Sequence, residues 1–130
     1  MADEAHLTLL KQGVDGWNAW RAAHASTPAD LANASLRGLD LARANLAGAD
    51  CRKADLRGTI LNGATLTDAN LAGANFFKAV LDAADLAGAN LSGAQFLNCA
   101  QLKTTRNWQF AFRDLDLACG APVPMIADPP

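Results

Sequence analysis

The hydrophobic residues of this chain recur every five positions over more than half of its length. Residues 29–98 divide without a gap into fourteen five-residue phrases, such as ADLAG at 84–88 and ANLSG at 89–93. The first residue of a phrase is Ala in twelve of them, the second is Asp or Asn in nine, and the third is apolar in all fourteen. We predict that the third residues form the interior: Leu31, Leu36, Leu41, Leu46, Cys51, Leu56, Leu61, Leu66, Leu71, Phe76, Leu81, Leu86, Leu91 and Phe96.

A period of five fits neither a helix nor a flat strand. Five residues of a helix turn by about 500°, which would scatter the third residues around the whole helix axis. In a flat strand, side chains alternate between two faces, so an odd period sends successive third residues to opposite faces. A short extended segment followed by a bend satisfies the pattern, because each bend returns the next Leu to the same interior. Gly, Asn and Asp are suited to such bends.

The phrase A-(D/N)-L-x-x resembles the repeat of the pentapeptide-repeat proteins. The resemblance implies an all-β solenoid, namely a right-handed quadrilateral β-helix with four phrases in each coil. Fourteen phrases then make about three and a half coils, and at the spacing of neighbouring strands the rod is only about 17 Å tall.

The segments that flank the phrases are predicted to close the ends of the solenoid, whose outermost edges would otherwise be unpaired. Residues 1–28 form a helical N-terminal cap, and two glycines leave open whether it is one helix or two. The repeats occupy 29–103, a C-terminal capping helix 104–120, and a Pro-rich tail 121–130. The apolar residues expected to seal the two ends are Leu10, Val14, Trp17, Trp20, Trp108 and Phe112.

The composition narrows the class of protein further. A length of 130 residues allows one domain, and a net charge of −2 predicts no strong attraction to nucleic acid or to a membrane surface. No apolar run is long enough to span a bilayer. The start, MADEAHLTLL, has acidic residues where a signal peptide has basic ones, so we expect a cytoplasmic location.

No catalytic, cofactor-binding or metal-binding residue is predicted. His6 and His24 are not spaced as a metal pair, and no phosphate loop or nucleophile motif is present. The Asp and Asn residues of the phrases are expected to serve the bends rather than to hold a cation. Cys51 takes an inward position and is expected to be inert. Cys99 and Cys119 could form a disulfide, but two free thiols are favoured in a cytoplasmic protein.

Two outward columns of residues, which meet around a corner of the coil, carry apolar side chains where polar ones are expected. Residues twenty apart should stack on neighbouring coils, which predicts an exposed patch formed by Ile60, Phe77, Val80 and Leu97. Soluble monomers tend to avoid such patches unless they are used. The C-terminal segment with Phe110 could cover the patch, a second copy could pack on it as a symmetric dimer, or another protein could bind there. We rank the three occupants in that order.

A structural or protein–protein interaction module is the function that the sequence favours, because nothing catalytic is visible. The resemblance implies an alternative, since some pentapeptide-repeat proteins act on DNA gyrase as acidic rods that mimic a duplex. Residues 29–98 hold seven Asp and six basic residues, a net charge of −1, whereas a duplex carries about one charge per 1.7 Å of its axis. The short rod and the near-neutral charge disfavour DNA mimicry, so the expected partner is an unknown protein.

Overall fold

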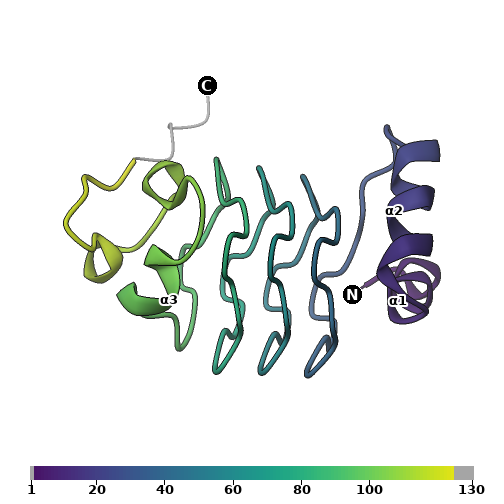
Figure 1. Cartoon of the computed structure of the whole chain (residues 1–130), viewed down its shortest axis with the longest axis horizontal. Coiled ribbons are helices and arrows are strands. Elements are labelled where there is room, and N and C mark those ends of the chain that lie inside the picture. The colour runs from purple at the N-terminus through teal and green to yellow at the C-terminus, as the bar shows by residue number, and fades with distance from the viewer. Residues whose placement is uncertain (1, 125–130) are drawn as a thin grey trace.

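A parallel ladder of backbone hydrogen bonds with a spacing of twenty residues organises the chain. The computed structural model, which describes residues 2–124, bridges Asp30 to Asp50 and Ile60 to Val80, and the same spacing holds all around the coil. Twenty residues are four phrases, so each turn of the chain contains four of them. The chain is a β-helix-like solenoid whose coils stack along the long axis of the molecule (Figure 1).

Two features of each phrase produce its bend. The fifth residue of the first thirteen phrases has a positive φ, which ranges from 56° at Lys53 to 71° at Gly38. The side chain of a second-position Asp or Asn accepts a hydrogen bond from the backbone N–H two residues later, as Asp30 Oδ1 does from Ala32 at 3.2 Å. The same bond forms in all nine phrases that carry Asp or Asn there. These side chains therefore hold the turns.

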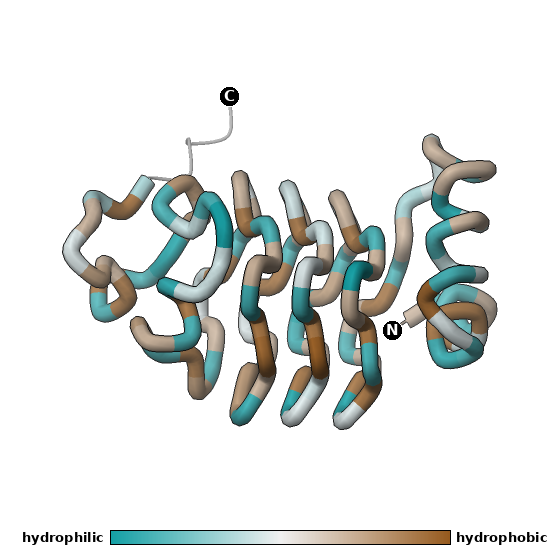
Figure 2. Tube along the Cα trace, in the orientation of Figure 1, coloured by the Kyte–Doolittle hydropathy of each residue, from teal (hydrophilic) through white to brown (hydrophobic). Residues whose placement is uncertain are grey.

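The first and third residues of the phrases fill a narrow interior. Thirteen of the fourteen predicted inward residues are at most 2% exposed, and the exception is Phe96. The Ala residues at the first position of the first thirteen phrases are buried as well. Thr59, which replaces one of these alanines, donates its hydroxyl to the carbonyl of Leu36 at 2.8 Å. Figure 2 shows hydrophobic and hydrophilic residues recurring in each successive coil, in keeping with this thin column of Ala and Leu.

The regular coil ends within the fourteenth phrase. Phe96, expected in the interior, has a φ of 57° and is 66% exposed, so that prediction was wrong. Leu97, expected outside, is partly buried against the core. The left-handed backbone falls on the third residue of this phrase instead of the fifth, so the bend comes two residues early and the two side chains exchange faces. Helix α3 (Cys99–Lys103) follows directly.

Two helices close the N-terminal end of the solenoid (Figure 1). Helix α1 (Glu4–Lys11) and helix α2 (Val14–Ala23) are separated at Gly13, whose φ of 136° is in the region that favours glycine. Four apolar residues pack these helices against the core: Leu10, Val14, Trp17 and Trp20.

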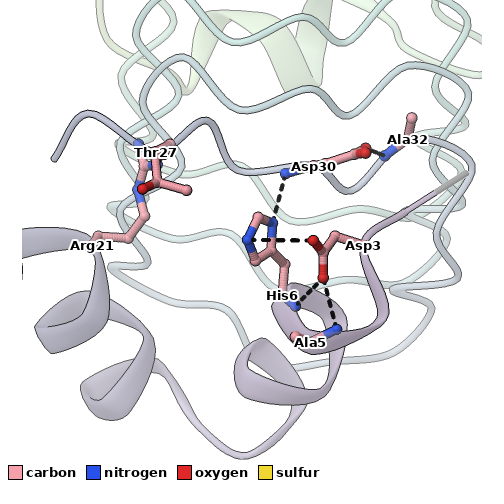
Figure 3. Close-up of polar contacts among 7 residues, drawn as sticks. All are labelled: Asp3, Ala5, His6, Arg21, Thr27, Asp30 and Ala32. Atoms are coloured by element: carbon pink, nitrogen blue, oxygen red, sulfur yellow. Dashed lines mark hydrogen bonds and ion pairs between the residues drawn. The ribbon is translucent and has the colours of Figure 1, made fainter. Parts of the chain in front are cut away.

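Polar groups of both helices bind the free edge of the first coil. Trp17 Nε1 donates to the carbonyl of Asn45 at 2.8 Å, and the Asn18 side chain accepts from the N–H of Asn45 at 2.7 Å. Figure 3 shows His6 facing Asp30, whose backbone N–H donates to His6 Nδ1 at 3.1 Å. These bonds satisfy donors and acceptors that have no preceding coil to pair with.

The C-terminal end is closed by irregular chain rather than by the helix predicted for residues 104–120. Only two single turns of 3-10 helix occur there, η1 (Trp108–Phe110) and η2 (Leu115–Leu117). Between them the chain re-enters the ladder, where Phe112 bridges Asn90. Backbone groups that pair with a neighbouring coil are not available for bonds within a helix, which is why the prediction was wrong.

A buried guanidinium stabilises this irregular cap. Arg113 is 5% exposed and donates to five backbone carbonyls, of which those of Leu117 and Ala118 are both at 2.8 Å. The guanidinium also lies over the ring of Trp108, 5.1 Å from its centroid. Trp108 and Phe112, the predicted sealing residues of this end, are both half-buried.

A disulfide joins Cys99 to Cys119, where the sequence favoured two free thiols. Cys99 is the first residue of α3, and Cys119 follows η2 closely in the chain. The return of the chain to the end of the solenoid brings their Cα atoms to 5.6 Å, which the sequence spacing did not reveal. The last part of the predicted Pro-rich tail, 125–130, lies outside the described residues.

Candidate functional site

An apolar patch lies on the outer surface of the solenoid, at one corner of the coil. Ile60 and Val80 are bridged neighbours on successive coils and are 37% and 39% exposed. Phe77 is 46% exposed and Phe96 is 66% exposed. We call these four residues the aromatic patch. It differs from the predicted patch by one exchange, because Leu97 packs against the core and Phe96 lies outside in its place.

Phe77 and Phe96 form the centre of the aromatic patch. Their ring centroids are 5.5 Å apart and their planes are inclined by 71°, the edge-to-face arrangement that aromatic pairs favour. Together with Arg57 and Asn75 they line a hollow of about 170 Å³. Pockets for small molecules usually measure about 300–1,000 Å³, so this hollow is suited to a single side chain rather than to a cofactor.

Three basic residues lie around a second hollow beside Phe77. Arg37, Arg57 and Lys78 line this hollow of about 270 Å³, together with Gly58 and Phe77. The Nζ atom of Lys78 lies 5.4 Å from the centroid of the Phe77 ring. No carboxylate is among the residues that line either hollow. The site is therefore apolar at its centre and positively charged along one side.

Arg57 is held in position by Asp55. Its Nε and Nη2 atoms donate to the two carboxylate oxygens at 2.8 and 2.7 Å. The side-chain hydrogen bond from Arg57 is the main cause that lowers the pKa of Asp55, and the charge of Arg37 contributes in the same direction. Arg52 makes the same paired contact with Asp50 one phrase earlier, at another corner of the coil. The two arginines are thus a matched pair, of which only Arg57 borders the aromatic patch.

Residues up to 124 leave the aromatic patch open to solvent. Phe110, the residue expected to fold over it, is itself 65% exposed and belongs to η1 in the C-terminal cap. The expectation that the C-terminal segment covers the patch is therefore wrong for the part of the chain that the structure describes. A second copy and another protein remain as occupants.

Cys51 lies in the core of the solenoid. Cys51 is 1% exposed, and burial, with a smaller contribution from the charges of Asp50 and Asp30, raises the pKa of its thiol to about 12. A thiol of this kind is inert as a nucleophile.

Within residues 2–124, no group of three or more His, Cys, Asp or Glu side chains is arranged to hold a metal ion. Over the same range, no helix has the length and apolar character needed to cross a membrane.

Another hollow, of about 540 Å³, lies beside α1 and belongs to the N-terminal cap. His6, Leu9 and Trp20 are among its lining residues. The His6 and Trp20 rings contact each other at 4.8 Å between centroids, and His6 also binds the backbone of Asp30. Since these side chains already fix the cap to the first coil, we interpret this hollow as a result of the packing of the cap and not as a ligand site.

Sequence reasoning placed Ile60, Phe77 and Val80 on the surface but missed two parts of the site. Phe96 was missed because the phrase was assumed to continue unchanged through residue 98. The sequence does contain a signal for this break: AQLKT at 100–104 resembles a phrase, but it follows the phrase ending at 98 only after one extra residue, Cys99. The basic residues beside Phe77 could also be predicted from the sequence, since Arg37 and Arg57 precede Phe77 in its column at intervals of twenty residues.

The repeat has counterparts in known proteins. The sequence profile of the pentapeptide repeats matches residues 29–63 and 64–99, with eight copies. The chain is similar to the solved structure of a pentapeptide repeat protein from the thylakoid lumen of Arabidopsis thaliana, with 24% identity over 75% of this chain and 68% of that one, at a TM-score of 0.49.

A second similar structure is HetL, a pentapeptide repeat protein involved in the regulation of heterocyst differentiation in Nostoc sp. strain PCC 7120. The identity is 29% over 65% of this chain and 40% of HetL, at a TM-score of 0.30. No curated protein matches the chain. Because the profile match spans more than half of the sequence, the chain belongs to the pentapeptide-repeat family.

Proposed function

We propose that this protein is a non-enzymatic interaction module that presents the aromatic patch to another protein. The scaffold of this proposal is a right-handed, four-sided β-helix, closed by two helices at its N-terminal end and by α3 with the irregular C-terminal segment at the other. The observation that carries the proposal is the exposure of Phe77 and Phe96 on a solenoid whose repeat leucines are buried. Soluble proteins rarely expose contiguous apolar surface unless it is used for binding.

The charge beside the patch favours a different protein over a second copy as the occupant. A symmetric dimer would place the same surface of both chains in contact. With the two-fold axis close to Phe77, Arg37, Arg57 and Lys78 of one chain would approach the same basic residues of the other. Like charges brought together across an interface are costly, so a homodimer through this patch is disfavoured.

The alternatives have less support. The interior is filled by Ala and Leu side chains, and the Cys51 thiol is buried among them, which favours a scaffold over a catalyst. DNA mimicry requires a strongly acidic surface, whereas residues 29–98 have a net charge of −1 and the exposed patch borders on basic residues.

Affinity capture from the source cells tests the proposal, with wild type, Phe77→Ser and Leu115→Ser compared by quantitative mass spectrometry. Leu115 is 85% exposed in the C-terminal cap, so its replacement removes apolar surface at a different place. We expect a partner that wild type and Leu115→Ser retain and that Phe77→Ser loses. An identical set of captured proteins for all three chains would contradict the proposal.

A further inference from the structure

We infer that the aromatic patch binds an acidic segment of another protein, in which an apolar side chain is flanked by carboxylates. The inference rests on the proposed function and adds the chemistry of the partner. Its basis is that the two hollows share Phe77 and Arg57 as a common wall, although one is mainly aromatic and the other is mainly basic. A single short segment can therefore occupy both hollows at once.

The aromatic hollow accounts for the apolar side chain. Phe77 and Phe96 meet edge to face, so one ring presents its edge to the face of the other. Both remain about half exposed or more, at 46% and 66%, so much of their surface is still in water. An apolar side chain inserted between these rings and Asn75 would remove that surface from water, which favours association.

The basic hollow accounts for the carboxylates. Arg37 and Lys78 make no ion pair within residues 2–124, and Arg57 uses only its Nε and Nη2 atoms on Asp55. The Nη1 atom of Arg57 has no hydrogen-bond acceptor in the described chain. Two unpaired cations and one open guanidinium edge together are complementary to more than one carboxylate.

A protein segment fits this site better than a nucleic acid does. Nucleic-acid binding depends on neutralising several phosphates, and proteins that do so are usually basic. Here only three basic residues border the aromatic rings, one of them is already paired, and the chain has a net charge of −2.

Fluorescence anisotropy with three labelled nine-residue peptides tests the inference. The first has the core Glu-Glu-Leu-Glu-Glu between Gly-Ser ends, the second has Lys in place of every Glu, and the third has Ser in place of Leu. We expect the first peptide to bind at least about tenfold more tightly than either of the others, because only it offers both chemistries. The affinity should fall as salt increases, since the basic side chains are exposed.

Matched variants assign the binding to the site. Phe77→Ser and Arg57→Ser should each weaken the acidic peptide at least about fivefold. Arg52→Ser should leave its affinity unchanged, because Arg52 makes the same ion pair with Asp50 at another corner. An unchanged circular dichroism spectrum for all three variants would show that the solenoid still folds.

The possible outcomes separate this inference from the proposed function. If the acidic and Lys peptides bind equally and Phe77→Ser abolishes both, the patch is a docking site but the acidic preference is overturned. Failure of all three peptides, tighter binding of a labelled oligo(dT), or binding insensitive to Phe77→Ser would also overturn the inference. A concentration-dependent increase in mass that Phe77→Ser abolishes would identify a second copy as the occupant. The capture experiment judges the proposed function independently of all these results.

Discussion

At the scale of single residues, the fold depends on a left-handed turn that recurs in every phrase. Gly occupies seven of the fourteen fifth positions, and the others among the first thirteen are Asn, Asp, Arg, Lys and one Ala. Ala83 has a φ of 61° and, unlike Asn or Asp, has no side-chain polar group to bond locally. The backbone at Ala83 is therefore the position at which glycine would be most favourable.

We predict that Ala83→Gly stabilises the protein. Glycine adopts a positive φ without the steric cost that a Cβ atom imposes, although it also loses more conformational entropy on folding. The net gain should be about 0.5–1 kcal/mol, seen as a higher urea midpoint with an unchanged slope. Ala87→Gly is the control: Ala87 is the fourth residue of the next phrase and is not among the residues with a positive φ, so this change should not stabilise the protein. A lower midpoint for Ala83→Gly would contradict the role given to the turn.

The three cysteines give a second prediction at this scale. Cys51 is buried with its pKa raised to about 12, and Cys99 and Cys119 are joined in a disulfide. Protein purified without reductant should show no thiol reactive to Ellman's reagent while folded and one thiol after unfolding in urea. Two reactive thiols in the folded protein would show that Cys99 and Cys119 are free, as the sequence alone had favoured.

At the scale of elements, the two caps use different chemistry. The N-terminal helices combine apolar packing with side-chain bonds to the edge of the first coil, such as Trp17 to Asn45. The C-terminal cap has little regular structure and depends on Arg113, whose donors bind five carbonyls, and on the disulfide. The C-terminal cap should consequently be sensitive to the loss of a single side chain.

We predict that Arg113→Met loosens the C-terminal cap while the coils persist. Buried carbonyls left without a donor each cost on the order of 1–3 kcal/mol, so the segment that Arg113 organises should open locally. Hydrogen exchange followed by mass spectrometry should show lost protection in residues 109–122 and retained protection in residues 40–80. Arg106→Met, with an exposed side chain in the same segment, is the control. Equal effects of the two changes would contradict the role of Arg113.

The solenoid could be predicted from the sequence, whereas the details of its ends could not. A strict period of five has few structural solutions, and the positions of Leu36 or Leu71 follow from it directly. The C-terminal cap has no such period. Trp108 and Phe112 are spaced as on a helix, yet Phe112 pairs with Asn90 because a solenoid edge offers unpaired backbone groups. The spacing of neighbouring residues indicates a tendency to form a helix, but it does not show whether the backbone will pair with a distant coil instead.

The candidate site shows the same limit. Ile60, Phe77 and Val80 follow from the column spacing, and so does the nearness of Arg57 to Phe77. The reversal of Phe96 and Leu97 depends on where the backbone leaves the coil, which a single left-handed residue decides. The place of Phe96 in the aromatic patch therefore could not be predicted from the column spacing.

At the scale of the whole molecule, the protein is a short stack of coils with both ends occupied and its sides exposed (Figure 1). The helical segments α1 and α2 take one end, and α3 with the irregular C-terminal segment takes the other. Association through the ends is thereby limited, and the aromatic patch, which we propose as the docking surface, lies on an exposed side. The central claim is that another protein occupies this patch.

Photo-crosslinking tests this claim most directly. Phe77 is replaced by p-benzoylphenylalanine in the source cells, Leu115 is replaced in the same way as a control, and the adducts are identified by mass spectrometry. The account predicts an adduct with a different protein from position 77 that position 115 does not give. It would be contradicted by adducts from position 77 that contain only a second copy of this chain or its own residues 125–130, or by identical adducts from both positions.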